Sequence, residues 1–287
     1  MKRRETDDRS HPNMLRRWFM RSEQVSSQAF ASVLLAFFLV SVFVLTWTTY
    51  SFASTLYVPP NSTSYIDGDH VYDSAEIRGT LILQGNTYLN VTGNGVPSGE
   101  HAFILTGSIG CDLLQPPQKP DGENQDGDPG PDGYSLSISV DGDALWTGTV
   151  EVDGQRGGLG GWPGKRGSGG NGGDGGDGGH FYFFITGRLE GKVRVSAQGG
   201  DGAPAAYPTW TGSCGEPGNG GSGGNIEIMA GEMGPYTTSR GCDLNATGGG
   251  GGRGGGTYNA SSGYDNLPPQ AGGDGGKGAR IKLSGCV

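Results

Sequence analysis

The residue types that could bind a metal ion gather between Asp121 and Asp132. The stretch DGENQDGDPGPDG places four aspartates there, Asp121, Asp126, Asp128 and Asp132. Carboxylate oxygens are the ligands that Ca²⁺ prefers, but the spacing and the missing final Glu do not match an EF-hand loop. We expect a solvated acidic turn and no cofactor, with Ca²⁺ as the alternative.

Three further motifs resemble known sites and are each incomplete. GGNGGD (169–174) matches the start of a calcium-binding nonapeptide, but Gly176 stands where a large apolar residue is required. GGSGG (220–224) fits the pattern of a nucleophile elbow, yet it follows no predicted strand and opens no predicted helix. Lys165 and Lys277 lack the rest of a phosphate-binding loop. The sequence therefore predicts no catalytic residue and a protein that is not an enzyme.

Aromatic residues are the best candidates for a binding surface. Five of them lie in the glycine-poor middles of the glycine tracts: Trp162, Tyr207, Trp210, Tyr258 and Tyr264. Exposed rings give a binding surface a large contact area at a small loss of side-chain entropy. The alternative is that these rings cap the tracts and exclude water from them.

The glycine tracts themselves have a period of three. Glycine occupies every third position from Gly158 to Gly179 without a gap. Three residues per turn is the period of the polyproline II helix, which makes no internal hydrogen bonds. Such chains satisfy their backbone groups only by packing against one another, and glycine allows the close approach. We therefore expect a bundle of polyglycine II legs.

Short alternating strands separate the glycine tracts. Four of them close on glycines that are 45, 44 and 54 residues apart: SLSISVDG (135–142), HFYFFITG (180–187), NIEIMAG (225–231) and ARIKLSG (279–285). Their period of two puts apolar residues on one face, and such repeats predict stacked units. Proline and bulky residues in the middle of each tract predict a turn. The expected fold is an all-β, repeat-based region, a β-solenoid or sheet base that carries a packed polyglycine II bundle.

The N-terminal residues predict a transmembrane helix ahead of this region. Ala29 to Trp47 is a run of 19 residues without a charge. About 20 apolar residues span a bilayer as a helix. Seven Lys and Arg in residues 1–27 put the N-terminus in the cytoplasm by the positive-inside rule. Residues 51–287 are then extracytoplasmic on a membrane anchor, or secreted if a signal peptide is cleaved after Ala53.

These patterns divide the chain into five segments. They are a basic leader (1–27), a transmembrane segment (28–50), a linker (51–70), a β-rich domain (71–153) and a glycine-rich β/polyglycine II domain (154–287). The linker is predicted from the prolines and polar residues of VPPNSTSYIDG (58–68). The last boundary follows the rise in glycine content.

The chain beyond the apolar run is acidic and carries candidates for covalent modification. It has 13 Lys and Arg against 25 Asp and Glu, a net charge of −12, which argues against nucleic acid as a partner. Four sequons make glycosylation candidates of Asn61, Asn90, Asn245 and Asn259. Four cysteines predict two disulfides with three connectivities open: Cys111, Cys214, Cys242 and Cys286. The alternative is buried thiols.

Tracts such as GSGGNGGDGGDGG and GSCGEPGNGGSGG resemble the glycine-rich modules of bacteriophage tail-tip adhesins. They are also similar to collagen-like and other glycine-rich microbial surface proteins. The likeness covers residues 154–278 and rests on composition and period. It implies a sandwich of polyglycine helices whose tip loops meet a receptor. The N-terminal apolar segment departs from the phage pattern.

The sequence favours an exported, non-enzymatic cell-surface protein that displays loop tips for adhesion or recognition of a surface glycan or protein. One alternative is a polysaccharide lyase or hydrolase on a β-solenoid, working through outward strand residues such as Glu151, Arg194, Glu227 and Lys282. The other is a self-assembling coat or fibre protein, a homo-oligomer in which the tracts pack between copies.

Overall fold

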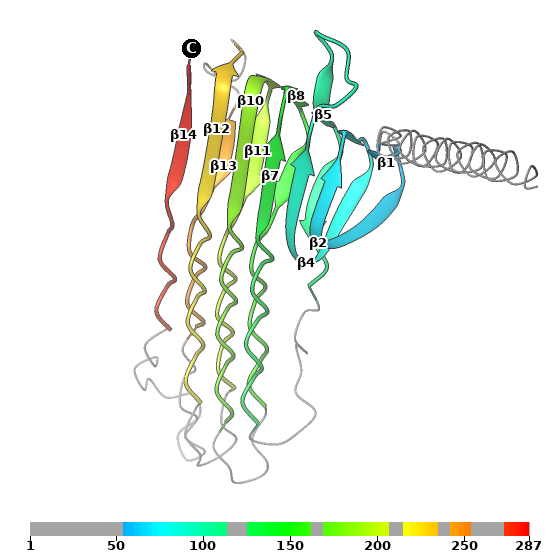
Figure 1. Cartoon of the computed structure of the whole chain (residues 1–287). Coiled ribbons are helices and arrows are strands. Elements are labelled where there is room, and N and C mark those ends of the chain that lie inside the picture. The colour runs from blue at the N-terminus through cyan, green and yellow to red at the C-terminus, as the bar shows by residue number, and fades with distance from the viewer. Residues whose placement is uncertain are drawn as a thin grey trace, which may run out of the picture. The chain divides into compact units, whose positions relative to one another are not determined.

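The computed structural model describes residues 54–113, 125–161, 169–206, 215–234, 242–253 and 273–286. All of them belong to one compact unit, Ala53–Val287. Every regular element in these ranges is a β-strand. The glycine-rich tracts between strands run as extended legs (Figure 1).

In the described ranges, fourteen strands, all paired in parallel, form one sheet that curls into a half-barrel. The strands are β1 (Thr55–Val58), β2 (Thr63–Tyr72), β3 (Ser74–Ile77), β4 (Thr80–Val91), β5 (His101–Leu105), β6 (Ser108–Cys111), β7 (Leu136–Val140), β8 (Asp143–Trp146), β9 (Thr149–Glu151), β10 (Phe181–Gly191), β11 (Val193–Ser196), β12 (Ile226–Met233), β13 (Cys242–Asn245) and β14 (Ile281–Cys286). Parallel neighbours cannot be joined by a tight hairpin. The chain instead winds in successive circuits, each stacked on the one before.

Each circuit contributes strands to three faces of the half-barrel. Face 1 consists of β1, β3, β5 and β8 with the C-terminal ends of β10 and β12. Face 2 consists of the N-terminal halves of β2 and β4 with β6, β9, β11 and β13. Face 3 consists of the C-terminal halves of β2 and β4, then β7, the N-terminal halves of β10 and β12, and β14. Register shifts in β2, β10 and β12 mark the bends between faces.

The hydrophobic core lies on the inner side of these faces. Alternation along β10 buries Phe181 and Phe183 and leaves Tyr182 and Phe184 outside. The ring centroid of Trp146 lies 5.1 Å from that of Phe183 in an edge-on arrangement. The buried indole N–H of Trp146 donates to a nearby backbone carbonyl at 3.0 Å, so its polar group is satisfied. This aromatic cluster joins the strands before and after the first pair of legs into one core.

The legs form two layers that are hydrogen-bonded within and between layers. Outgoing legs leave face 2 and return legs enter face 3 (Figure 1). The outgoing legs are 152–161, 197–206 and 246–253, and the return legs are 125–134, 169–179, 215–224 and 273–279. The Gly175 N–H donates to Asn219 in its own layer at 2.7 Å, and the Gly176 N–H donates to Gln155 in the other layer at 2.9 Å. Two of every three backbone N–H groups in this leg thus donate to backbone carbonyls of neighbouring legs.

Glycine is needed in the legs because main chains meet there without side chains between them. A Cβ added to Gly176 would lie 2.1 Å from the carbonyl oxygen of Pro131 in the adjacent leg. Gly173, one turn away, has the same relation to Asp128 at 2.0 Å. The period of three keeps the same side of the leg against the same neighbour, which explains the spacing of the glycines.

The predicted fold class is corrected by this architecture. The sequence predicted an N-terminal transmembrane helix at residues 28–50, but those residues lie outside the described ranges, and the described ranges contain no helix that is long and apolar enough to cross a membrane. A long apolar run meets the length requirement of a span without by itself establishing one. The fold of the described residues is a parallel-strand half-barrel. The structure gives no support for a membrane anchor, for the membrane as a partner, or for the extracytoplasmic or secreted placement of residues 51–287.

Strand β2 and the hydrophobic core run across two of the predicted segment boundaries. Residues expected to form a linker contain β1 and most of β2, and Val58 and Ile66 are buried in the core. Residues on both sides of the expected boundary after residue 153 belong to one hydrophobic core: Val152 before it and Ala197 after it pack with the earlier strands. Prolines and polar residues at turns and on the outer side of the first circuit gave it the composition of a linker.

Candidate functional site

The five aromatics predicted to form a binding surface lie outside the described residues: Trp162, Tyr207, Trp210, Tyr258 and Tyr264. The leg ends that carry these segments are described. The Gly170 N–H donates to Gly161 at 3.0 Å, and the Ala206 N–H donates to Gly170 at 3.2 Å. The segments 162–168 and 207–214 therefore start from leg ends that are fixed next to one another.

A second set of aromatic side chains lies on the outer side of face 3. Tyr88, Tyr182 and Phe184 are 40%, 39% and 46% exposed. Tyr88 of β4 and Tyr182 of β10 both pair with Ser137 of the intervening β7. They are therefore two strand spacings apart, about 10 Å, with a small serine between them. Alternation in HFYFFITG could have placed Tyr182 and Phe184 outside, but the sequence could not bring Tyr88 beside them.

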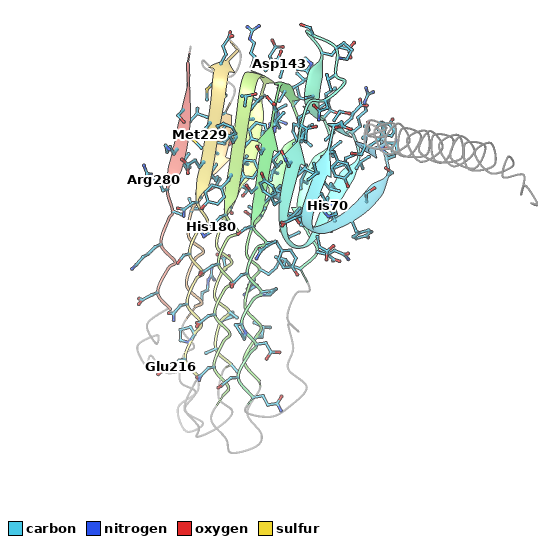
Figure 2. All side chains as sticks on the ribbon, viewed as in Figure 1. His70, Asp143, His180, Glu216, Met229 and Arg280 are labelled. Atoms are coloured by element: carbon cyan, nitrogen blue, oxygen red, sulfur yellow. The ribbon has the colours of Figure 1, made fainter. Side chains whose placement is uncertain are left out.

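Polar side chains border this aromatic surface where the strands continue into the legs. The His180 ring lies edge-on to Tyr182, with centroids 6.2 Å apart. Its Nδ1 accepts the Asn225 N–H at 3.0 Å, and the Ser135 hydroxyl accepts the His180 N–H at 3.2 Å. Asn86 continues the row by accepting the Ser135 N–H at 2.8 Å. Figure 2 shows His180 at this junction, with Arg280 farther along toward β14.

A hollow of about 590 Å³ opens beside this polar row. Its lining includes Asn86, Asp132, Ser135, Asp177 and His180. The lining offers amide, hydroxyl, carboxylate and imidazole groups, and its His180 lies edge-on to the exposed ring of Tyr182. Such a combination of ring faces and hydrogen-bonding groups suits a ligand that has both C–H surfaces and hydroxyl groups.

The outward residues proposed for catalysis divide between two faces. Glu227 and Lys282 form an ion pair with each other on face 3. Glu151 and Arg194 lie on face 2 and line a hollow of about 230 Å³ with Asp243. Only the face 2 group therefore brings a carboxylate and a guanidinium together at a concave surface.

The acids considered for calcium instead bind backbone groups. Asp126 and Asp132 each accept, through Oδ1, an N–H of the next return leg, at 2.8 and 2.7 Å. Within GGNGGD, Asn171 and Asp174 do the same for the following leg, at 2.7 and 2.6 Å. Across the described ranges no three His, Cys, Asp or Glu form a group that could hold a metal ion. Asp121 lies outside these ranges.

The predicted disulfides are corrected for the two described cysteines, Cys111 and Cys242, which are thiols. The Cys111 sulfur lies 4.0 Å from the carbonyl oxygen of Tyr134, and burial raises the pKa of this thiol to about 11. Burial also raises the pKa of Cys242. The half-barrel core already holds these strands together, so an even cysteine count was not a sufficient sign of bridges. The side chains of Cys214 and Cys286 lie outside the described set.

The glycosylation candidates occupy different settings. Asn61 is exposed in a turn with a φ of 59°. Asn90 is half-buried on β4. Asn245 on β13 accepts the Thr247 N–H and hydroxyl at 3.2 and 3.0 Å, a bond between the two polar residues of its own sequon. Asn259 is outside the described residues.

No family model matches the chain, and no curated protein matches it. Among solved structures, the chain is similar to a springtail antifreeze protein from Granisotoma rainieri, a bundle of nine polyproline type II helices whose crystal waters match the ice lattice. The identity is 20%, the match covers 61% of this chain and 98% of that chain, and the TM-score is 0.22. At this TM-score the likeness carries no argument about fold or function.

Proposed function

We propose that this protein is a non-enzymatic recognition protein, a β/polyglycine scaffold that presents binding surfaces to a glycan. The observation that carries the proposal is the pair Tyr88 and Tyr182, exposed on either side of Ser137 on strands whose inner sides are fully packed. Rings held on strands bind without losing much conformational freedom. A ring face contacts the apolar side of a sugar, while Ser137, His180 and Asn86 supply hydrogen bonds for its hydroxyl groups.

The legs support a second recognition surface within the same function. Their ends are hydrogen-bonded to one another, so the segments that join them leave from fixed positions. The predicted aromatics Trp162, Tyr207 and Trp210 belong to those segments. Display of loops on a rigid scaffold is a common arrangement for binding.

A glycan array probed with the full chain tests the proposal. The double variant Tyr88→Ser/Tyr182→Ser removes the face 3 rings, and the triple variant Trp162→Ser/Tyr207→Ser/Trp210→Ser removes those of the leg segments. Tyr57→Ser, which alters an exposed tyrosine on face 1, is the matched control. We expect the double variant to lose glycan binding and the control to keep it. Binding lost only in the triple variant would move the site to the leg segments, and binding unchanged in both would refute recognition through aromatic rings.

The hollow on face 2 favours a second candidate, cleavage of a polysaccharide. Glu151, Arg194 and Asp243 line it, and a lyase or hydrolase uses carboxylate and cationic groups set along a groove. A screen of polysaccharides for release of reducing ends is the test. Cleavage that is lost in Glu151→Gln and kept in Glu227→Gln would establish this reading.

A further inference from the structure

The two ends of the half-barrel are both open strand edges. β14 pairs only with β12, and β2 pairs only with β4, among the strands that the structure describes. Figure 1 shows β14 at one end of the sheet and β1 and β2 at the other. An unpaired edge presents backbone N–H and C=O groups that another strand can bind.

The order of the faces makes these two ends complementary. The chain visits face 1, then face 2, then face 3 in each circuit, beginning with β1 on face 1. Its last described strand, β14, lies on face 3 as far as Gly285, and Cys286 passes the bend to pair with Glu232 on face 1. A second copy whose β2 follows β14 therefore continues face 3 in the same winding order.

The outward residues in this continuation are complementary in charge. One row across face 3 runs through Asp69, Tyr88, Ser137, Tyr182, Glu227 and Lys282, each in register with the next. Lys282 ends the row of described residues and pairs with Glu227. Asp69 begins the row and is exposed. Stacking a second copy in the same register sets its Asp69 beside Lys282.

The inward residues at the β14 end are apolar and uncovered. Ile281 and Leu283 are in register with the buried Ile226 and Ile228, yet they are 44% and 41% exposed. At the opposite end the inward rings of His70 and Tyr72 are stacked, with centroids 6.0 Å apart. In the continued register Leu283 falls opposite His70 of the second copy. Covering apolar side chains by a flat ring pair removes apolar surface from water.

We propose that copies of this chain associate head to tail, β14 of one copy adding in parallel to the β2 edge of the next. The contact joins two different surfaces, and because each copy is displaced along the axis on which the strands stack, the series does not close into a ring and builds a filament. Each copy adds six strand layers, an axial repeat of about 29 Å at about 4.8 Å per layer. This association is independent of the glycan-binding proposal, since the outer side of face 3 stays exposed along the filament.

Two charge-reversed full-length chains test the proposal. Asp69→Lys places a lysine of the next copy beside Lys282, and Lys282→Glu places a glutamate beside Asp69 of the next copy. Each variant alone should raise the dissociation constant for self-association by about tenfold or more, because like charges then meet at the contact. Mixed together, the variants should assemble in alternation, because contacts between the two again join opposite charges. Asp67→Lys, an equal charge change outside the row, is the control, and any association through residues 1–53 is common to all the chains.

Sedimentation velocity over a range of concentrations, with electron microscopy of the wild type, gives the outcome. A growing series of oligomers for the wild type, its loss in each variant and its recovery in the mixture support the proposal. A wild type that stays monomeric, or that stops at a dimer by pairing β14 with β14, overturns it. Variants that assemble as well as the wild type overturn it too.

Discussion

The Oδ1 atom of Asp177 accepts the backbone N–H of Ser222 at 2.6 Å, across 45 residues of sequence. Asp177 in turn donates its own N–H to Oδ1 of Asp132, also 45 residues away, at 2.7 Å. The outward side chain of one return leg thus satisfies the one backbone donor of the next leg that faces neither layer. In the bundle, acidic side chains that look like ligands are structural acceptors.

This role predicts that Asp177→Ala destabilises the protein more than Asp177→Asn does. Alanine leaves the Ser222 N–H without its side-chain acceptor, whereas the asparagine carbonyl keeps one. Because the position is exposed, we expect a loss of about 1 kcal/mol in the free energy of unfolding for alanine and little change for asparagine. Urea denaturation of both variants measures the difference. Equal losses would show that charge, and not the hydrogen bond, matters at this position.

Two glycines in the legs should respond to alanine in opposite ways. Gly176→Ala puts a methyl group 2.1 Å from the Pro131 carbonyl oxygen, and should cost on the order of 3 kcal/mol of stability because backbone must move. Gly275 is also in a return leg, but a Cβ there would meet only the Gly249 oxygen at 3.6 Å. Gly275→Ala should be neutral or stabilising by about 0.5 kcal/mol. Thermal unfolding measures the change in stability of each variant. Equal changes for Gly176→Ala and Gly275→Ala would contradict the packing of the legs described here.

The carboxylate of Asp73 should make the first circuit sensitive to acid. Its oxygens accept the Ser54 N–H at 2.8 Å and the Thr92 hydroxyl at 3.0 Å, and these bonds lower its pKa below the ordinary value of 3.8. A lowered pKa contributes stability that is present above the unfolded value and is lost as the pH falls through the folded one. Asp73→Asn should therefore be less stable than the wild type near neutral pH, and the gap should narrow below about pH 4. A gap that does not depend on pH in denaturation curves would contradict this assignment.

The Cys111 thiol should be protected from thiol reagents in the folded protein, and its ionisation should lower the stability of the fold at high pH. Its pKa is raised by burial from 9.0 to about 11, so folding favours the protonated thiol. Stability that is present below the unfolded value is then lost as the pH rises from 9.0 toward 11. Compared with Cys111→Ala, the wild type should lose more stability over this interval. Titration with a thiol reagent near pH 8 should find the same number of reactive thiols in the folded wild type and the folded Cys111→Ala variant. After unfolding it should find one more in the wild type.

The parts of the fold that follow from local pattern were predictable. Alternation in HFYFFITG gave the strand that became β10, and the period of three from Gly158 to Gly179 gave extended legs that must pack together. The tyrosines of face 3 show the limit of this reasoning. Tyr88 and Tyr182 are 94 residues apart in the sequence and become neighbours of Ser137 only through strand order.

By itself the sequence determined the strands that border the glycine tracts, the legs that these tracts form and the apolar side of those strands. These properties depend on steric and hydrophobic periods within a few residues, and a chain carries them before it folds. Only the tertiary structure decided that three faces enclose one core, that Asp and Asn side chains bind the next leg, and that Asp69 and Lys282 stand at opposite ends of one row. Those relations depend on register between segments 19 to 55 residues apart, which no local pattern specifies.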